Sequence, residues 1–297
     1  MPAEAPAIDE WLESAPIAGS STGEFTSSDG AKLGFTGYRA STQQTGTGLV
    51  YLHGIESHAG WFDGPARLLQ EGGYSCFCLD RRGSGINREN RGFRSGDVDS
   101  FRTLFKDIRA FREQLGGRFE RAYLVGLSWG GKLGTGYVLS HPDDFDGLVL
   151  ITPGLAARVD VRFPQKVGIF FSLLLAPTTT FKLPIEPEMF TTTERFVEFI
   201  RTDPLRLQRA TARFLYESRR LDRYVAAHIK QNTLPTQLFL ASEDRIINNT
   251  GVFELLARSP ERELEVHTYE GLEHSLQFEC PERLVGDMTA WIEQQRK

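Results

Sequence analysis

The chain has 297 residues, of which 40% are hydrophobic and 25% are charged. It is long enough for one or two domains with a large core, and this composition excludes a disordered chain, a coiled coil or a collagen. Its 34 Lys plus Arg against 39 Asp plus Glu give a formal net charge of −5, which is too acidic for a surface that binds the nucleic-acid backbone, so we expect no nucleic-acid partner.

The N-terminal segment shows no pattern of export or of regular structure. Residues 1–20 are rich in Ala, Pro, Ser and acidic residues and lack the basic and apolar parts of a secretory signal, so an irregular arm is predicted. Residues 24–39 then predict a β-hairpin that turns at 28–30, because Asp29-Gly30 accepts the positive φ angles of a tight turn.

Two short apolar runs, 49–53 and 74–80, predict buried strands. Between them, residues 61–71 fit a helix that stops at Gly72-Gly73. The second run holds two of the three cysteines, whose odd number and close spacing do not fit a disulfide framework. We therefore expect reduced thiols and a cytoplasmic location.

Residues 101–115 form the clearest amphipathic pattern, with apolar side chains at helical spacing and basic side chains on the other face. Asp97 or Asp99 is expected to cap the start of this helix. Four further strand patterns follow, at 122–126, 147–152, 236–241 and 264–269. Because these strands alternate with helical or long connecting segments, the chain predicts a mainly parallel sheet covered on both faces.

Residues 154–235 separate two of these strands, and this is far more chain than one crossover helix requires. The segment has helical patterns of its own at 167–175, 193–201 and 205–216, so it predicts a small helical cap. The chain then divides into three parts. Their predicted bounds are 1–20 for the arm, 21–153 with 236–297 for the core, and 154–235 for the cap.

The strongly apolar run 167–176 lies inside this predicted cap. As a helix it would span about 15 Å, half of the roughly 30 Å bilayer core, so it cannot cross a membrane. A helix that is apolar nearly all round covers a core, lines a lipid-binding pocket or docks on a membrane surface. On the second interpretation, Phe170, Phe171 and Leu174 line the substrate pocket.

The candidate nucleophile lies in the sequence Gly-Leu-Ser-Trp-Gly at 126–130, directly after the strand pattern 122–126 and before a helix-compatible stretch. G-x-S-x-G between a strand and a helix is typical of a serine held on a sharp turn with its hydroxyl exposed, here Ser128. The same stretch matches G-x-x-x-x-G-K through Lys132, but Leu133 stands where a hydroxyl must bind Mg²⁺. We therefore disfavour nucleotide binding and expect Lys132 at the helix surface.

A serine hydroxyl needs a base to take its proton, and the base needs a third group that orients it. Of the six histidines, His274 follows the nucleophile and a late strand pattern as this chemistry requires. The acid then lies at the end of the strand pattern 236–241, where Glu243 and Asp244 are adjacent.

Acyl transfer also needs donors that stabilise the oxyanion. We expect one to be the backbone N–H of Trp129, which follows the nucleophile, and the other to be that of Ile55 in the loop after the strand pattern 49–53, with Glu56 as second choice. His53 is expected to brace this loop rather than to carry a proton.

Together these motifs resemble those of the α/β-hydrolase superfamily, most closely its monoacylglycerol lipase and lysophospholipase branch, which is serine aminopeptidase S33-like. The resemblance rests on the segments 53–58, 79–85, 126–130, 241–244 and 269–274. It implies an α/β-hydrolase fold, with a mostly parallel eight-stranded sheet and a helical cap inserted after strand 6. It also implies Asp244 as the acid of a triad with Ser128 and His274.

Two departures from the pattern concern the site. The glutamate of the H-G-x-x-E-H loop is shifted by one position to Glu56, and Trp129 places a large ring beside the nucleophile, where the branch often has Met. We therefore expect a narrower acyl pocket than in a glyceride lipase.

The resemblance implies a serine hydrolase that cleaves carboxylic esters of medium- or long-chain acyl groups, monoacylglycerol- or lysophospholipid-like, through an acyl-enzyme. We expect neither a metal nor another cofactor. The expected partner is a small-molecule acyl ester, with lipid or peripheral membrane contact through the cap as a further interpretation, and no oligomeric state is predicted. A thioesterase or amidase with the same triad, and a non-catalytic ligand-binding protein on the same scaffold, are the alternatives.

Overall fold

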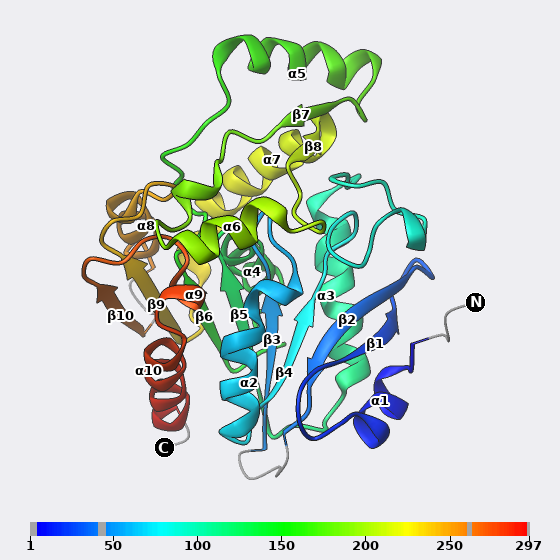
Figure 1. The fold of residues 1–297 in the computed structure, drawn as a ribbon, viewed down its shortest axis with the longest axis vertical. Helices are drawn as coiled ribbons and strands as arrows, with labels where there is room; N and C mark the ends of the chain where they lie inside the picture. The colour runs from blue at the N-terminus through cyan, green and yellow to red at the C-terminus, as the bar shows by residue number, and fades with distance from the viewer. Residues whose placement is uncertain (1–4, 41–45, 260–262, 296–297) are drawn as a thin grey trace.

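The computed structural model describes residues 5–40, 46–259 and 263–295. Its strands are β1 (Ser21–Thr26), β2 (Lys32–Tyr38), β3 (Thr47–Leu52), β4 (Ser75–Leu79), β5 (Arg121–Leu127), β6 (Gly147–Ile151), β7 (Thr180–Lys182), β8 (Arg209–Thr211), β9 (Thr236–Ala241) and β10 (Leu264–Tyr269). Eight of them form one sheet in the order β1-β2-β4-β3-β5-β6-β9-β10 (Figure 1). The six strands from β4 to β10 in this order run parallel, and β2 is antiparallel to both β1 and β4. The predicted α/β-hydrolase sheet is therefore confirmed.

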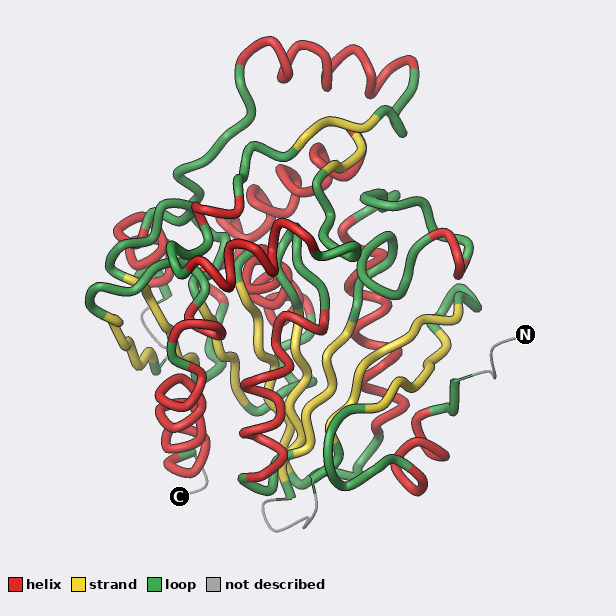
Figure 2. Tube along the Cα trace, viewed as in Figure 1, coloured by secondary structure: helices red, strands yellow, loops and turns green. Residues whose placement is uncertain are grey.

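Helices cover both faces of this sheet (Figure 2). The α-helices are α1 (Ile8–Ser14), α2 (Asp63–Glu71), α3 (Phe101–Leu115), α4 (Trp129–Ser140), α5 (Phe163–Leu175), α6 (Glu194–Thr202), α7 (Ala212–His228), α8 (Asn249–Leu256), α9 (Leu276–Glu279) and α10 (Pro281–Gln294). The short 3₁₀ helices are η1 (Ala59–Phe62), η2 (Glu89–Arg91), η3 (Pro187–Met189) and η4 (Ile229–Gln231). One apolar cluster joins α1, α3, α4 and α8 to the sheet, and a second joins α2 and α10 to it. Because they are covered on both faces, β3, β4, β6 and β9 are buried at every residue.

The predicted hairpin and the amphipathic helix are both present. β1 pairs with β2 across a turn in which Gly30 has a φ of +82°. α3 has the predicted bounds, but its N-cap is Ser100, whose side chain accepts a hydrogen bond from the N–H of Arg102. The capping prediction was therefore wrong, because Asp97 binds Arg213 instead.

The prediction of an irregular arm was wrong for residues 8–14, which form α1. Trp11 of this helix is 1% exposed and packs edge-on against Phe35 and Phe77. A Cβ at Gly37 would lie 2.2 Å from the Trp11 ring, so the absent side chain makes room for the indole. The large apolar area of the indole stabilises a helix that its own short sequence does not predict. Residues 1–4 of the predicted arm lie outside the described residues.

The chain between β6 and β9 carries α5, β7, η3, α6, β8, α7 and η4. We name residues 154–235 the inserted segment. In Figure 1, α5, β7, β8 and α6 lie beyond the carboxyl ends of the parallel strands, with α5 farthest from the sheet. The segment then returns along α7, which packs on α4, to the start of β9. The predicted helix 205–216 is displaced: residues 209–211 pair with β7, and the Thr211 side chain then caps α7 by accepting from the N–H of Phe214. Among the described residues, no helix is long and apolar enough to span a bilayer.

Candidate active site

Ser128 occupies the sharp turn between β5 and α4. Its backbone angles are φ 52° and ψ −122°, one of two positive φ values among the described non-glycine residues. Such a conformation costs roughly 1–3 kcal/mol and persists only where the surrounding structure imposes it. The strand-turn-helix setting predicted for Gly-Leu-Ser-Trp-Gly is thus present, and Ser128 lines a cavity.

The glycines on either side let the turn approach its neighbours. A Cβ at Gly126 would lie 2.6 Å from the Cα of Gly131, and one at Gly130 would lie 2.1 Å from the carbonyl oxygen of Leu52. No larger residue fits these positions without moving the backbone of β3 or α4. The turn is therefore held by direct backbone contact with the adjacent strand.

His274 and Asp244 form a buried pair at the carboxyl ends of β10 and β9. His274 Nδ1 lies 2.7 Å from Asp244 Oδ2, and both side chains are 0% exposed. The other carboxylate oxygen accepts the N–H groups of Ile246 and Ile247, each at 2.8 Å. His274 Nε2 is buried and has no hydrogen-bond partner among the described residues. Nε2 is therefore the ring nitrogen left without a contact, and among the described residues no hydrogen bond joins it to Ser128.

The loop after β3 packs directly on the nucleophile turn. A Cβ at Gly54 would lie 3.3 Å from the Cβ of Ser128. Arg81 donates to the carbonyl oxygens of Gly54, at 2.7 Å, and of Ile55. It therefore fixes the orientation of these peptide groups. Among the described residues, the N–H of Ile55 makes no hydrogen bond, and the N–H of Trp129, as the first residue of α4, has no intrahelical acceptor.

His53 braces this loop. It is 3% exposed, and its Nδ1 lies 2.8 Å from the Gly54 carbonyl oxygen, while the Arg81 N–H donates to its Nε2 at 3.3 Å. Burial lowers the pKa of His53 well below its usual value. The side chain is therefore a neutral structural group at neutral pH.

The same loop is joined to the inserted segment by buried polar contacts. Arg206 Nη2 lies 2.7 Å from Glu56 Oε2, and these side chains are 6% and 1% exposed. Asp203 Oδ2 lies 3.0 Å from His58 Nε2 and accepts the indole N–H of Trp61 at 2.6 Å. Burial raises the pKa of Glu56 to about 7, although the Arg206 guanidinium opposes this shift.

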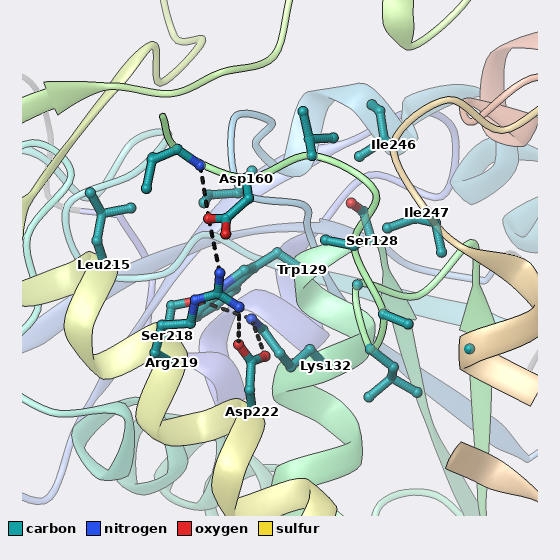
Figure 3. A pocket seen from close by; sticks show the side chains of 18 of the residues that line it. Ser128, Trp129, Lys132, Asp160, Leu215, Ser218, Arg219, Asp222, Ile246 and Ile247 are labelled. Atoms are coloured by element: carbon teal, nitrogen blue, oxygen red, sulfur yellow. Dashed lines mark hydrogen bonds and ion pairs between the residues drawn. The ribbon is translucent and has the colours of Figure 1, made fainter. Parts of the chain in front are cut away.

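A cavity of about 890 Å³ opens between the core and the inserted segment beside Ser128. Figure 3 shows the charged and polar side chains of α7 on one side of it and Ile246 and Ile247 on the other. Trp129 reaches toward α7 and donates its indole N–H to Ser218 at 2.9 Å. The ring is thus fixed as one wall of the cavity.

Lys132 lies in the site, and its predicted position at the helix surface was wrong. It is 6% exposed rather than at the surface, because α7 packs over this side of α4. Its ammonium donates to Ser218 Oγ at 2.9 Å and to Asp222 Oδ1 at 2.7 Å. A lysine four residues after the nucleophile was the one available signal, since four residues bring two side chains to the same helix face.

The three residues predicted to line the pocket lie elsewhere. Phe170, Phe171 and Leu174 are 59%, 56% and 69% exposed on α5. The cavity is lined instead by Lys166 and Ile169 of the same helix. No residue of α5 is buried, and Phe170, Phe171 and Leu174 are not among the residues that line the cavity, so this interpretation of the three side chains is replaced.

The site contains no evident metal centre: in residues 5–40, 46–259 and 263–295, no group of three His, Cys, Asp or Glu side chains is placed to bind a metal. The three cysteines are free thiols.

A mostly parallel eight-stranded sheet with a serine on a strand-turn-helix elbow defines an α/β-hydrolase. The family described as serine aminopeptidase, S33, matches residues 43–281. Since this is more than half of the sequence, the chain belongs to that family.

Sequence similarity to known proteins supports this family assignment. The chain is 26% identical over 262 residues to human monoglyceride lipase, with 84% of each chain covered. It is 27% identical over 280 residues to a monoacylglycerol lipase of Mycolicibacterium smegmatis, with 90% of this chain and 95% of the relative covered. These proteins and the family match confirm the resemblance to the monoacylglycerol lipase branch, and the chain is a carboxylic ester hydrolase.

Solved structures show the same fold. A soluble variant of monoglyceride lipase from Saccharomyces cerevisiae, in complex with a substrate analog, superposes with a TM-score of 0.79 at 17% identity, covering 91% of this chain and 94% of that one. Monoacylglycerol lipase from Paleococcus ferrophilus superposes with a TM-score of 0.76 at 18% identity, covering 93% and 99%.

Proposed function

We propose that the protein hydrolyses monoacyl esters of medium- or long-chain fatty acids, monoacylglycerol- or lysophospholipid-like, through a serine acyl-enzyme. The observation that carries this proposal is the combination of a strained Ser128 lining a large cavity with a buried His274–Asp244 pair whose Nε2 is unpaired. The names of the relatives, monoglyceride and monoacylglycerol lipases, support this substrate class.

The proposed reaction has two halves. Ser128 Oγ attacks the ester carbonyl carbon while His274 Nε2 takes its proton, and Asp244 accepts from Nδ1, fixing the tautomer and stabilising the imidazolium. The imidazolium then gives its proton to the departing alcohol oxygen, leaving an acyl-enzyme. A water attacks this ester with His274 as base, which releases the fatty acid and restores Ser128.

The negative charge that develops on the carbonyl oxygen requires nearby donors. We assign the N–H groups of Trp129 and Ile55, both without a partner among the described residues. Arg81 orients the N–H of Ile55, because it donates hydrogen bonds to the carbonyl oxygens of Gly54 and Ile55 on the other side of the loop. Such donors act strongly because they are oriented before the charge appears.

The inserted segment is proposed to act as a cap. It supplies part of the cavity through α5 and α7, and it is joined to the loop of Ile55 through the Glu56–Arg206 pair. The exposed apolar side of α5 is proposed to contact lipid surfaces from which a water-insoluble substrate is taken. A reducing compartment such as the cytoplasm stays our prediction, supported by the free thiols.

The decisive experiment is covalent labelling with a fluorophosphonate probe, followed by rate measurements on p-nitrophenyl esters of increasing chain length. Wild-type protein should be labelled and Ser128→Ala should not, although both are folded. The rate of p-nitrophenyl ester hydrolysis by wild type should rise with the length of the acyl chain. Failure of folded wild-type protein to label or to hydrolyse any ester would favour a non-catalytic binding protein, and a sharp preference for acetate would defeat the lipid substrate.

A further inference from the structure

One wall of the cavity carries an alternating chain of charges (Figure 3). Lys132 lies 2.7 Å from Asp222, which lies 3.5 Å from Arg219. Arg219 lies 2.9 Å from Asp160, which lies 2.6 Å from Lys166. This row of charged side chains joins α4, α7, the loop after β6 and α5. It begins and ends on a cation, so it holds one more positive charge than negative charges.

Among the cations of this row of charged side chains, Lys132 is nearest in sequence to the nucleophile. It follows Ser128 by four residues, about one helical turn or roughly 6 Å along the axis of α4. An ammonium has three donors, and among the described residues those of Lys132 bind Ser218 and Asp222. Because its side chain also lines the cavity, the remaining donor is available to a bound anion.

Arg219 offers a second donor group on the same wall. Its Nη1 lies 3.5 Å from Asp222, which is longer than an ordinary N–H···O hydrogen bond of about 2.7–3.2 Å. The side chain is 57% exposed and can turn toward a ligand. Across the whole cavity, the described lining residues include five Lys or Arg and three Asp or Glu side chains, so the lining attracts anions.

On the opposite side of the cavity lie the apolar side chains of Ile246 and Ile247 (Figure 3), and α8 adds Leu255 together with Glu254 to the lining. The two ends of an ester substrate differ in the same way, because the acyl chain is apolar and the alcohol part is polar. The acyl chain fits the apolar side, and the alcohol part then faces Lys132 and Arg219. A neutral glycerol makes no charged contact with Lys132 or Arg219, whereas a phosphate on that glycerol can accept charge-assisted hydrogen bonds from both.

We infer that Lys132 and Arg219 form a binding subsite for a phosphate carried by the alcohol part of the substrate. The inference rests on the proposed function and narrows it from monoacyl esters in general to monoacylglycerol phosphates, lysolipids with an anionic head. The reaction is unchanged, since the ester bond is cleaved by water and the products are a fatty acid and glycerol phosphate.

The first test compares monooleoylglycerol with monooleoylglycerol phosphate in the same detergent, for wild type, Lys132→Met and Lys106→Met. Wild type should favour the phosphate by at least about tenfold in kcat/KM, the size of one charge-assisted hydrogen bond. Lys132→Met should lower this preference to about one, whereas Lys106→Met, which removes the same charge from the exposed side of α3, should keep it. Arg219→Gln, at a half-exposed position, should reduce the preference without affecting folding. A wild type that favours the neutral ester, or an unchanged preference in both Lys132→Met and Arg219→Gln, would overturn the inference.

A second measurement needs no variant. Glycerol phosphate should inhibit the hydrolysis of p-nitrophenyl butyrate by wild type competitively, and glycerol at the same concentration should not. If glycerol phosphate and glycerol inhibited equally, or if neither inhibited, the phosphate subsite would be contradicted. If inorganic phosphate inhibited as strongly as glycerol phosphate, the subsite would not be one for the headgroup of a substrate. Absence of p-nitrophenyl butyrate hydrolysis together with absence of fluorophosphonate labelling would instead remove the proposed function itself.

Discussion

The backbone at Ser128 is maintained by steric contacts that can be tested one residue at a time. Gly130→Ala would place a methyl group 2.1 Å from the Leu52 carbonyl oxygen, so β3 or α4 must move. We expect a loss of roughly 2 kcal/mol in the free energy of unfolding and a larger proportional loss of esterase activity. Urea unfolding and p-nitrophenyl butyrate hydrolysis measure the two effects.

The matched control lies one turn further along the same helix. A Cβ at Gly134 would make only ordinary contacts with Leu124 and Leu148, of 3.4 and 3.5 Å. Gly134→Ala should therefore keep activity and raise stability by up to about 1 kcal/mol, because alanine is the better helix former. If the two substitutions had the same effect, the steric account of the elbow would be wrong.

The acid of the proposed triad can be separated from its neighbour. Asp244→Asn keeps an oxygen for the N–H groups of Ile246 and Ile247 but no longer stabilises a His274 imidazolium. We expect kcat for p-nitrophenyl butyrate to fall by about 10⁴-fold, as in enzymes with this triad, with little change in melting temperature. Glu243→Gln, at the adjacent position, should keep kcat within a few fold of wild type. The reverse pattern would assign the acid to Glu243.

At the scale of elements, α5 is the helix whose apolar residues the structure leaves most exposed. Phe171 and Leu174 lose little contact on substitution, since they are 56% and 69% exposed. Phe171→Asp with Leu174→Asp should therefore leave the melting temperature unchanged but reduce co-sedimentation with phosphatidylcholine vesicles several-fold. Phe253→Asp removes an aromatic ring that is 49% exposed on α8 and should not alter vesicle binding. Equal binding by all variants would exclude α5 as the lipid contact.

Two elements show when the local sequence pattern predicts the structure and when tertiary contacts override it. α3 was predicted with the correct bounds because its apolar stripe and its terminal glycines are properties of the local sequence. The helix expected at 205–216 instead begins at Ala212, because residues 209–211 pair with β7. A strand pairing between residues about thirty positions apart leaves no periodic signal in either segment.

At the scale of the whole molecule, the Glu56–Arg206 pair connects the inserted segment with the core. The folded state raises the pKa of Glu56 from 4.5 to about 7, mainly through burial; Glu186 adds to the shift, and Arg206 and Lys182 oppose it. The native state then holds a proton that the unfolded chain has lost. Glu56 should therefore reduce stability as pH rises from about 4.5 to about 7, by up to about 3 kcal/mol.

The comparison of wild type with Glu56→Gln isolates this contribution. The free energy of unfolding of wild type relative to Glu56→Gln should decrease between pH 4.5 and pH 7 and stay constant above that range. Urea unfolding across this range provides the measurement. A difference that increased with pH would mean that the ion pair with Arg206 dominates over burial.

The amino-acid sequence by itself determined the parallel strands, the amphipathic α3, the elbow at Ser128 and the order in which Asp244 and His274 follow it. These depend on local periodicity and on turn residues, which neighbouring positions specify. Only the tertiary structure decided that Lys132 is buried, that α7 supplies Ser218 and Asp222 to it, and that Trp11 anchors α1. Each of these depends on contact between segments far apart in the chain, and such contacts form only when the sheet brings the segments together.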